Sequence, residues 1–179
     1  VYIHLHLHRD EATLSIDLSG KSLHRRGWRT AHVQAPLKET LAAAILYRGG
    51  WQSIMNEPDV ALLDPMCGSG TFLIEGWMMA ADIAPGLGRP DGFGLETWLG
   101  HDRHLWNDLL REARERQAAG LEKQLPMFVA YDKDHQVVKM ARQNIHAADA
   151  QQHIRIQQRE ILEVQPPTDA GLLVTNPPY

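Results

Sequence analysis

The spacing of hydrophobic and polar residues predicts a β-hairpin at the start of the chain. Aliphatic residues and histidines alternate over residues 3–8, and a second alternating stretch covers residues 13–18 after the polar Arg9-Asp10-Glu11. Alternation with a period of two is typical of strands that bury one face. Three histidines on one strand face could bind zinc, but no second cluster in the sequence completes a tetrahedral site. We interpret them as the polar face of the hairpin and expect no metal.

Beyond the hairpin, short apolar runs alternate with stretches of helical spacing, which is typical of an α/β fold with a parallel sheet. Numbered along the chain, the four predicted strands should lie in the spatial order 3-2-1-4. They cover residues 60–64, 127–131, 153–157 and 171–175. The predicted helices begin at Pro36, Thr71, Arg103 and Val137. The helix from Thr71 is apolar nearly all round, which predicts that it is buried.

The helix from Pro36 is predicted from two signals at its ends. Proline is tolerated in the first turn of a helix, and the pair Gly49-Gly50 is a typical end. We expect an apolar stripe to form its buried face. The stripe comprises Leu37, Leu41, Ile45 and Leu46.

A glycine-containing loop after the strand at 60–64 carries the first chemical signal. Gly68 and Gly70 allow a sharp turn and a close approach to a ligand, because neither has a Cβ. A dinucleotide fingerprint requires a third glycine where Leu73 stands, and a Walker loop requires a lysine that does not follow Gly70. Asp64, at the end of the strand, favours a positively charged ligand and repels a pyrophosphate. S-adenosylmethionine, with its sulfonium and α-amino groups, matches this preference.

The second signal is Asn176-Pro177-Pro178-Tyr179, which follows the last predicted strand. Two prolines end the strand and leave an amide, a free carbonyl and an aromatic ring at the same carboxyl edge. The Asn176 side-chain oxygen and the Pro177 carbonyl can accept the two hydrogens of an amino group. That contact orients the nitrogen lone pair and stabilises the positive charge that develops on nitrogen. Tyr179 can stack on a base taken out of its helix.

Together, Asp-Pro-Met-Cys-Gly-Ser-Gly-Thr at 64–71 and Asn-Pro-Pro-Tyr at 176–179 resemble class I S-adenosylmethionine-dependent methyltransferases that act on amino groups. With Arg25-Arg26-Gly27-Trp28-Arg29 ahead of it, the first motif resembles the bacterial RlmL family, which methylates guanine N2 in large-subunit (23S) ribosomal RNA. The resemblance covers about residues 17–179. It implies a Rossmann-like α/β methyltransferase core with an incomplete sheet, preceded by the β-hairpin.

The resemblance also implies a division of the chain, which we interpret as a fragment of a longer enzyme. Residues 1–34 are expected to be a β-hairpin and a basic linker from an upstream RNA-binding region. Residues 35–179 are expected to be the N-terminal part of the methyltransferase domain. In this family, a segment corresponding to residues 35–37 closes one side of the cofactor site.

Two further carboxylates are assigned to the cofactor. Asp132, after the second strand, can accept two hydrogen bonds from ribose hydroxyls, with Asp134 as the near alternative. The resemblance implies that Glu160 faces the adenine amino group; a plain loop carboxylate is the alternative. Cys67 is interpreted as a small loop residue and not as a nucleophile. The predicted cofactor-binding residues are Asp64, Pro65, Met66, Cys67, Gly68, Gly70, Thr71, Asp132, Asp134 and Glu160.

The basic loop before the first helix has two interpretations. Cations beside an aromatic ring suit phosphate and base contacts, which predicts RNA binding. An ordinary solvated loop, with its tryptophan covering the edge of the domain, agrees equally well with the sequence. The residues concerned are Arg25, Arg26, Trp28 and Arg29.

Composition restricts the location more than the activity. The chain has 179 residues, 44% of them hydrophobic and 22% charged, as in soluble globular proteins. A single cysteine excludes a disulfide framework, and no apolar run is long enough to span a membrane. We therefore expect a cytoplasmic protein. The net charge of −4 argues against this stretch gripping RNA by itself.

Three rival functions remain at the level of sequence. N6-adenine methylation of DNA is the nearest, because Asn-Pro-Pro-Tyr can serve either exocyclic amine. A non-catalytic scaffold that binds the cofactor and RNA is the second, although Asn176 argues against it. An NAD-dependent oxidoreductase is disfavoured by Leu73.

Overall fold

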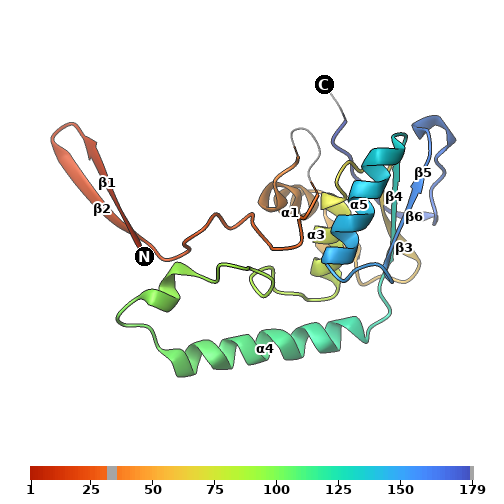
Figure 1. Cartoon of the computed structure of the whole chain (residues 1–179). Helices are drawn as coiled ribbons and strands as arrows, with labels where there is room; N and C mark the ends of the chain where they lie inside the picture. Colours follow the sequence, from red (N-terminus) through yellow and green to blue (C-terminus); the bar gives the residue numbers. More distant parts are fainter. Residues whose placement is uncertain (32–35, 178–179) are drawn as a thin grey trace.

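A parallel four-stranded sheet organises the protein, whose computed structural model describes residues 1–31 and 36–177. The spatial order of the strands is β5-β4-β3-β6, which confirms the order predicted from the sequence (Figure 1). Parallel pairing joins β3 to both β4 and β6, and β4 to β5. The strands are β3 (Val60–Asp64), β4 (Met127–Asp132), β5 (Ile154–Gln158) and β6 (Ala170–Leu173).

Helices cover the sheet, and the most buried of them follows β3 directly. In α3 (Thr71–Ala80) every residue except Met79 is buried, as the all-round apolar pattern predicts. Between these two elements, Gly76 lies against Leu62 of β3, so closely that a Cβ there would stand 2.2 Å from a Leu62 methyl carbon. The other helices and helical turns are α1 (Glu39–Arg48), α2 (Trp51–Ile54), η1 (Gly94–Thr97), α4 (Arg103–Leu121), α5 (His135–Ala147) and η2 (Ile161–Glu163).

The first helix differs from its prediction at both its start and its buried face. It begins at Glu39 instead of Pro36, and Leu41 and Ile45 of the expected stripe are exposed. The face that packs inward consists of Glu39, Ala42 and Leu46, which are spaced three and then four residues apart. Ala42 and Leu46 are fully buried on this face, and the Glu39 carboxylate pairs with the largely buried Arg29.

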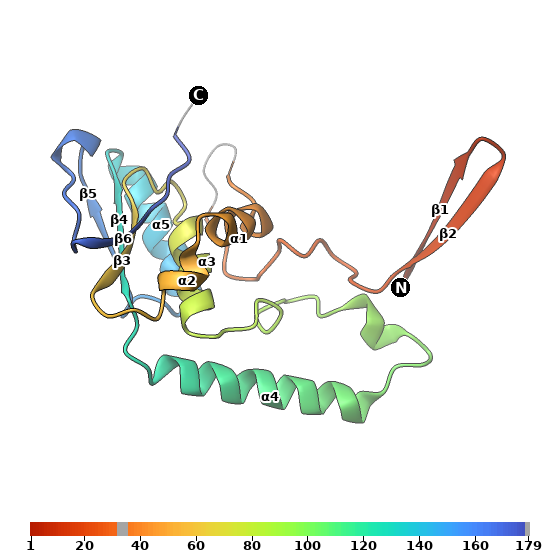
Figure 2. The ribbon, with the colours of Figure 1, turned by 180° about the vertical axis from the view of Figure 1, so that it is seen from behind.

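The long helix α4 runs from the hairpin side of the molecule toward the start of β4, as two views from opposite sides show (Figures 1 and 2). Near its C-terminal end Arg116 donates two hydrogen bonds to Asp82, at 2.6 and 2.9 Å. Gly120 lies directly against the backbone of Ala81, where a Cβ would collide with the carbonyl oxygen. No helix among residues 1–31 and 36–177 is long and apolar enough to cross a membrane.

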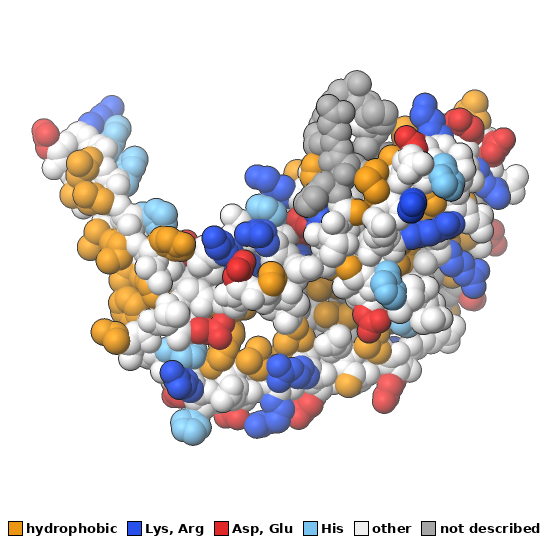
Figure 3. Space-filling model, in the orientation of Figure 1, with side chains coloured by type: hydrophobic (Ala, Val, Ile, Leu, Met, Phe, Trp, Pro, Cys, Tyr) orange, Lys and Arg blue, Asp and Glu red, His pale blue; other side chains and the backbone are white. Residues whose placement is uncertain are grey.

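The hairpin of β1 (Tyr2–His8) and β2 (Glu11–Asp17) projects away from the sheet (Figure 1). Its antiparallel register places Ile3 opposite Ile16 and Leu5 opposite Leu14 on one face. These side chains are exposed, and they form an apolar stripe along the projecting arm (Figure 3). The predicted alternation is therefore present, but the apolar face is not buried within the described part of the chain.

Candidate functional site

A cavity of about 640 Å³ lies at the carboxyl edge of the sheet. It collects residues from the glycine-containing loop, from the ends of β4 and β5, and from the segment after β6. Pro36 and Leu37 form a further part of its wall; Ala35, predicted beside them, lies outside the described residues. Of the predicted site residues, it brings together Asp64, Pro65, Met66, Cys67, Gly68, Thr71, Asp132, Glu160, Asn176 and Pro177.

The loop between β3 and α3 is held by hydrogen bonds to the end of β4. The Cys67 N–H donates to the Tyr131 carbonyl at 2.8 Å, and the Gly68 N–H donates to Asp132 Oδ2 at 3.1 Å. Gly68 and Gly70 have φ values of 54° and 81°, in the left-handed region that favours glycine. Gly70 supports this turn but does not line the cavity.

Asp64 is a buried carboxylate at the base of the cavity. Its side chain accepts a hydrogen bond from the Met66 N–H at 3.1 Å, and the residue is 1% exposed. Burial raises the pKa of Asp64 to about 7, while the Met66 N–H opposes that shift. A cationic ligand in the cavity would favour the ionised form of this group.

The two candidate ribose carboxylates have different surroundings. Asp132 lines the cavity, and its two oxygens accept from the N–H groups of Gly68 and Asp134. Each of these oxygens keeps a second lone pair, so two ligand hydroxyls could still be accepted. Asp134 is the N-cap of α5, accepts from the Gln136 N–H at 2.7 Å, and does not line the cavity.

The surroundings of Cys67 make its thiol a poor nucleophile. It is buried, and burial together with the Asp64 and Asp132 carboxylates raises the pKa of its thiol well above the usual value. The protonated thiol is a poor nucleophile. The geometry thus agrees with the interpretation of Cys67 as a small loop residue.

The segment after β6 reaches the cavity from the opposite side. The Val174 N–H donates to the Leu63 carbonyl at 2.9 Å, which continues the pairing with β3 one residue past the end of the strand. Asn176 and Pro177 then line the cavity and are solvent-exposed. Tyr179, the predicted stacking residue, lies outside the described residues.

Sequence reasoning missed two cations at this edge. Lys133 and Arg159 line the cavity, and each is adjacent in sequence to a predicted carboxylate. The Arg159 N–H donates to the Asp132 carbonyl at 2.9 Å, and its guanidinium lies 5.3 Å from the centre of the Tyr131 ring. Their position directly after two strand ends was the signal that could have identified them.

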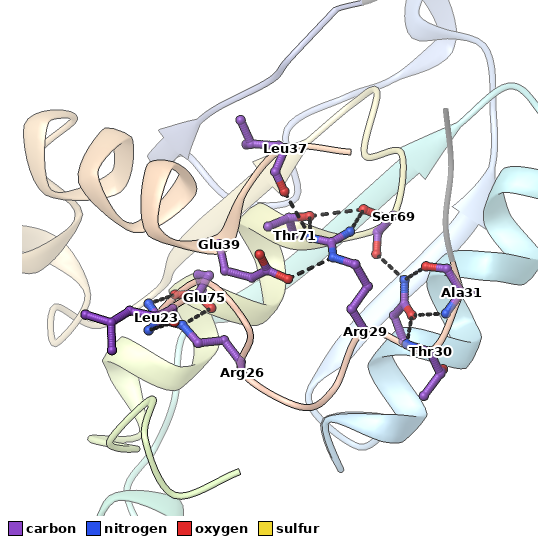
Figure 4. Close-up of polar contacts among 11 residues, drawn as sticks. Leu23, Arg26, Arg29, Thr30, Ala31, Leu37, Glu39, Ser69, Thr71 and Glu75 are labelled. Carbon is purple, nitrogen blue, oxygen red and sulfur yellow. Dashed lines mark hydrogen bonds and ion pairs between the residues drawn. The ribbon is translucent and has the colours of Figure 1, made fainter. Parts of the chain in front are cut away.

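The basic loop, for which the sequence left both RNA binding and an ordinary loop open, is mostly turned into the domain. Arg26 forms an ion pair with Glu75 at 3.2 Å, Arg29 forms one with Glu39 at 2.8 Å, and both guanidiniums are largely buried (Figure 4). Trp28 is 4% exposed. The two arginines can face the fold because Glu39 of α1 and Glu75 of α3 neutralise them, and Trp28 packs in the hydrophobic core. Arg25 alone of the cluster is solvent-exposed, 3.8 Å from Asp91.

Metal-binding geometry is not found in the described ranges. No group of three or more His, Cys, Asp or Glu side chains there is arranged to hold an ion. The histidines of β1 lie along one exposed face of the hairpin.

Known proteins with similar sequences are ribosomal RNA large subunit methyltransferases K/L. The protein of Syntrophotalea carbinolica is 51% identical over 188 residues, a match that covers 100% of this chain and 25% of the relative. The protein of Cellvibrio japonicus is 50% identical over 182 residues, with 99% and 24% covered. The chain thus spans about a quarter of the length of these relatives.

Solved structures agree with the fold over nearly the whole chain. SMU.472, described as a methyltransferase complexed with SAH, matches with a TM-score of 0.86 and 36% identity, covering 99% of this chain and 44% of that one. A predicted N6-adenine-specific DNA methylase from Listeria monocytogenes matches with a TM-score of 0.82 and 35% identity, with the same coverage.

The family assignment rests on most of the sequence. The family described as UPF0020, RMKL-like, methyltransferase domain, matches residues 26–179, which include the glycine-containing loop and the Asn-Pro-Pro-Tyr motif. The α/β architecture and the SAH-bound neighbour agree with that match. This chain therefore belongs to the RMKL-like methyltransferase domain family.

Proposed function

We propose that this chain is part of an S-adenosylmethionine-dependent methyltransferase that modifies large-subunit ribosomal RNA, with the N2 amino group of guanine as the acceptor. The observation that carries the proposal is the cavity, which joins the Asp64 loop and Asp132 to Asn176 and Pro177. Relatives named ribosomal RNA large subunit methyltransferase K/L support the RNA substrate. The likeness of residues 64–71 and 25–29 to the RlmL family supports guanine N2.

The residues present agree with S-adenosylmethionine as the cofactor. The cavity volume of about 640 Å³ lies within the usual range for cofactor sites. Asp64 offers negative charge to a cationic cofactor, and Asp132 offers two acceptor oxygens for ribose hydroxyls. Glu160 would accept from the adenine amino group. When bound, the cofactor supplies an electrophilic methyl group on a sulfonium.

The chain's contribution to the reaction is the placement of the acceptor nitrogen. The Asn176 side-chain oxygen and the Pro177 carbonyl would accept the two N–H hydrogens and direct the nitrogen lone pair into the cavity. The same oxygens would stabilise the positive charge that develops on nitrogen. Tyr179 would stack on the extruded base.

We also propose the division of the chain predicted above. Residues 1–34 would come from an upstream RNA-binding region, attached through the packed residues 26–31, and residues 35–179 would form the N-terminal part of the methyltransferase domain. Arg25, the exposed member of the basic cluster, is its candidate RNA contact.

N6-adenine methylation of DNA is the second candidate, supported by the description of the Listeria monocytogenes neighbour. The test incubates the full-length protein with labelled cofactor and either unmodified ribosomal RNA or duplex DNA, followed by digestion to nucleosides. We expect label in N2-methylguanosine. Label only in N6-methyladenine from DNA would replace guanine by adenine as the acceptor.

A further inference from the structure

A buried arginine lies directly behind the wall of the cavity. The Arg29 side chain is 11% exposed, and its guanidinium donates to four acceptors. Two of them are Glu39 Oε1 at 2.8 Å and the Leu37 carbonyl at 3.0 Å. The other two are Ser69 Oγ at 2.7 Å and Thr71 Oγ1 at 2.9 Å (Figure 4). A guanidinium has five N–H donors, so this site uses most of its capacity.

The acceptors of Arg29 belong to different walls of the cavity. Ser69 and Thr71 line it from the glycine-containing loop, and Leu37 lines it from the segment before α1. The fourth acceptor, Glu39, is the first residue of α1. One planar cation therefore connects the loop at the end of β3 to the wall segment and to the helix behind it.

A second buried side chain fixes the same place. Asn144 of α5 accepts from the N–H groups of Thr30 and Ala31, at 3.0 and 2.9 Å. It donates to the Ala31 carbonyl at 3.1 Å and to the Ser69 carbonyl at 3.2 Å. Residues 26–31, which we call the strap, are thus attached to α5, and Ser69 is held through its hydroxyl by Arg29 and through its backbone by Asn144.

Burying a salt bridge is a weak source of stability, because desolvation offsets much of the attraction. The geometry of Arg29 provides specificity instead, since four acceptors at fixed positions define one arrangement of loop and wall. The strap contains a natural contrast in Arg26, which pairs with Glu75 and the Leu23 carbonyl. Arg26 is equally buried but does not contact residues of the cavity at the sheet edge.

We propose that Arg29 is a positioning residue for the cofactor site: it holds Ser69, Thr71 and Leu37 in the arrangement that the cofactor requires. The proposal rests on the proposed function, because it assumes that S-adenosylmethionine occupies this cavity. Removing the guanidinium would take away its hydrogen bonds to the two loop hydroxyls, which would keep the bond between themselves, and would leave the Glu39 carboxylate without its arginine partner. Cofactor binding would then have to order the glycine-containing loop, which would lower the affinity for the cofactor.

The test compares Arg29→Met with the matched control Arg26→Met in the full-length protein. Calorimetry measures the Kd for S-adenosylmethionine, thermal melting measures stability, and hydrogen exchange measures protection of the amides at 67–71 without cofactor. We expect Arg29→Met to raise the Kd at least about tenfold and to speed exchange in the loop. Arg26→Met should keep the Kd within about twofold of the wild-type value, even if its Tm falls as much as that of Arg29→Met.

Equal changes in Kd and loop exchange for the two variants would overturn the proposal, because Arg29 would then act only through stability. Arg29→Lys provides a second variant if Arg29→Met does not fold. A lysine can pair with Glu39 but cannot reach all four acceptors, so we expect an intermediate Kd; a wild-type Kd would again overturn the proposal. A wild-type protein that fails to bind S-adenosylmethionine would refute the proposed function, while the exchange measurement would still test Arg29.

Discussion

A buried carboxylate marks the point where β3 meets the cavity. Asp64 ends a strand in which every residue is buried, and the Met66 backbone N–H donates to its carboxylate. An ionisable group in such surroundings is typical of a functional site, because a structural core would place an apolar residue there. Its raised pKa gives a pH signature that does not depend on any ligand.

We expect Asp64→Asn to change how stability depends on pH. The pKa of Asp64 rises from 3.8 to about 7 on folding, so the folded state binds this proton more tightly than the unfolded state. The associated stability is present below about pH 4 and is lost as the pH rises through about 7. Urea unfolding from pH 4 to 8 should show wild-type stability falling relative to the variant, by at most about 1.4 kcal/mol per pH unit. Parallel curves for the two proteins would contradict the assignment.

At the scale of elements, β3 and α3 pack so closely that no space is left for an added side-chain carbon between them. Both are nearly fully buried, and the helix lies against the strand through the bare backbone of Gly76. This contact fixes the position of the first turn of α3 relative to the sheet, and with it the position of the glycine-containing loop. The packing of the unit therefore determines the floor of the cavity.

Gly76→Ala should destabilise the protein, although alanine is the better helix former by about 1 kcal/mol. The new Cβ would stand 2.2 Å from a methyl carbon of Leu62, so this fully buried side chain would have to shift. We expect a net loss of about 1–3 kcal/mol in denaturant unfolding, as for other overpacked cores. In a Leu62→Ala background, which lacks the clashing methyl carbon, Gly76→Ala should lower the free energy of unfolding much less than it does alone. A stabilised single variant would show that the helix shifts freely.

The difference between α3 and α1 shows what the sequence could predict. The strand, loop and α3 follow one another along the chain, so their hydrophobic pattern was sufficient to predict them. Glu39, at the start of α1, pairs with Arg29, and Arg26 pairs with Glu75, 49 residues away. The spacing of Glu39, Ala42 and Leu46 was a local signal for the inward face, but nothing local identified the cations as its partners.

At the scale of the whole molecule, the site exists only because the sheet brings distant segments to one edge. Residues from Pro36 to Pro177 line the same cavity, and they reach it from the ends of β3, β4 and β5 and from the segment after β6. Topology alone predicts this convergence, because carboxyl ends of neighbouring parallel strands meet. The arrangement separates two groups: carboxylates on the β3–β5 side and the amide with its neighbouring carbonyl after β6.

That separation predicts different kinetic effects for variants on the two sides of the full-length protein. Asp132→Ala removes acceptors for the cofactor and should weaken S-adenosylmethionine binding by about 1.5–3 kcal/mol in calorimetry. Asn176→Ala should leave that affinity within about twofold and lower kcat by about 100-fold, because its oxygen is needed more in the transition state than in the ground state. Asn107→Ala, at an exposed position on α4, is the matched control and should change neither quantity. If Asn176→Ala weakened cofactor binding and left single-turnover rates intact, the asparagine would belong to the cofactor side of the cavity and the proposed acceptor geometry would be wrong.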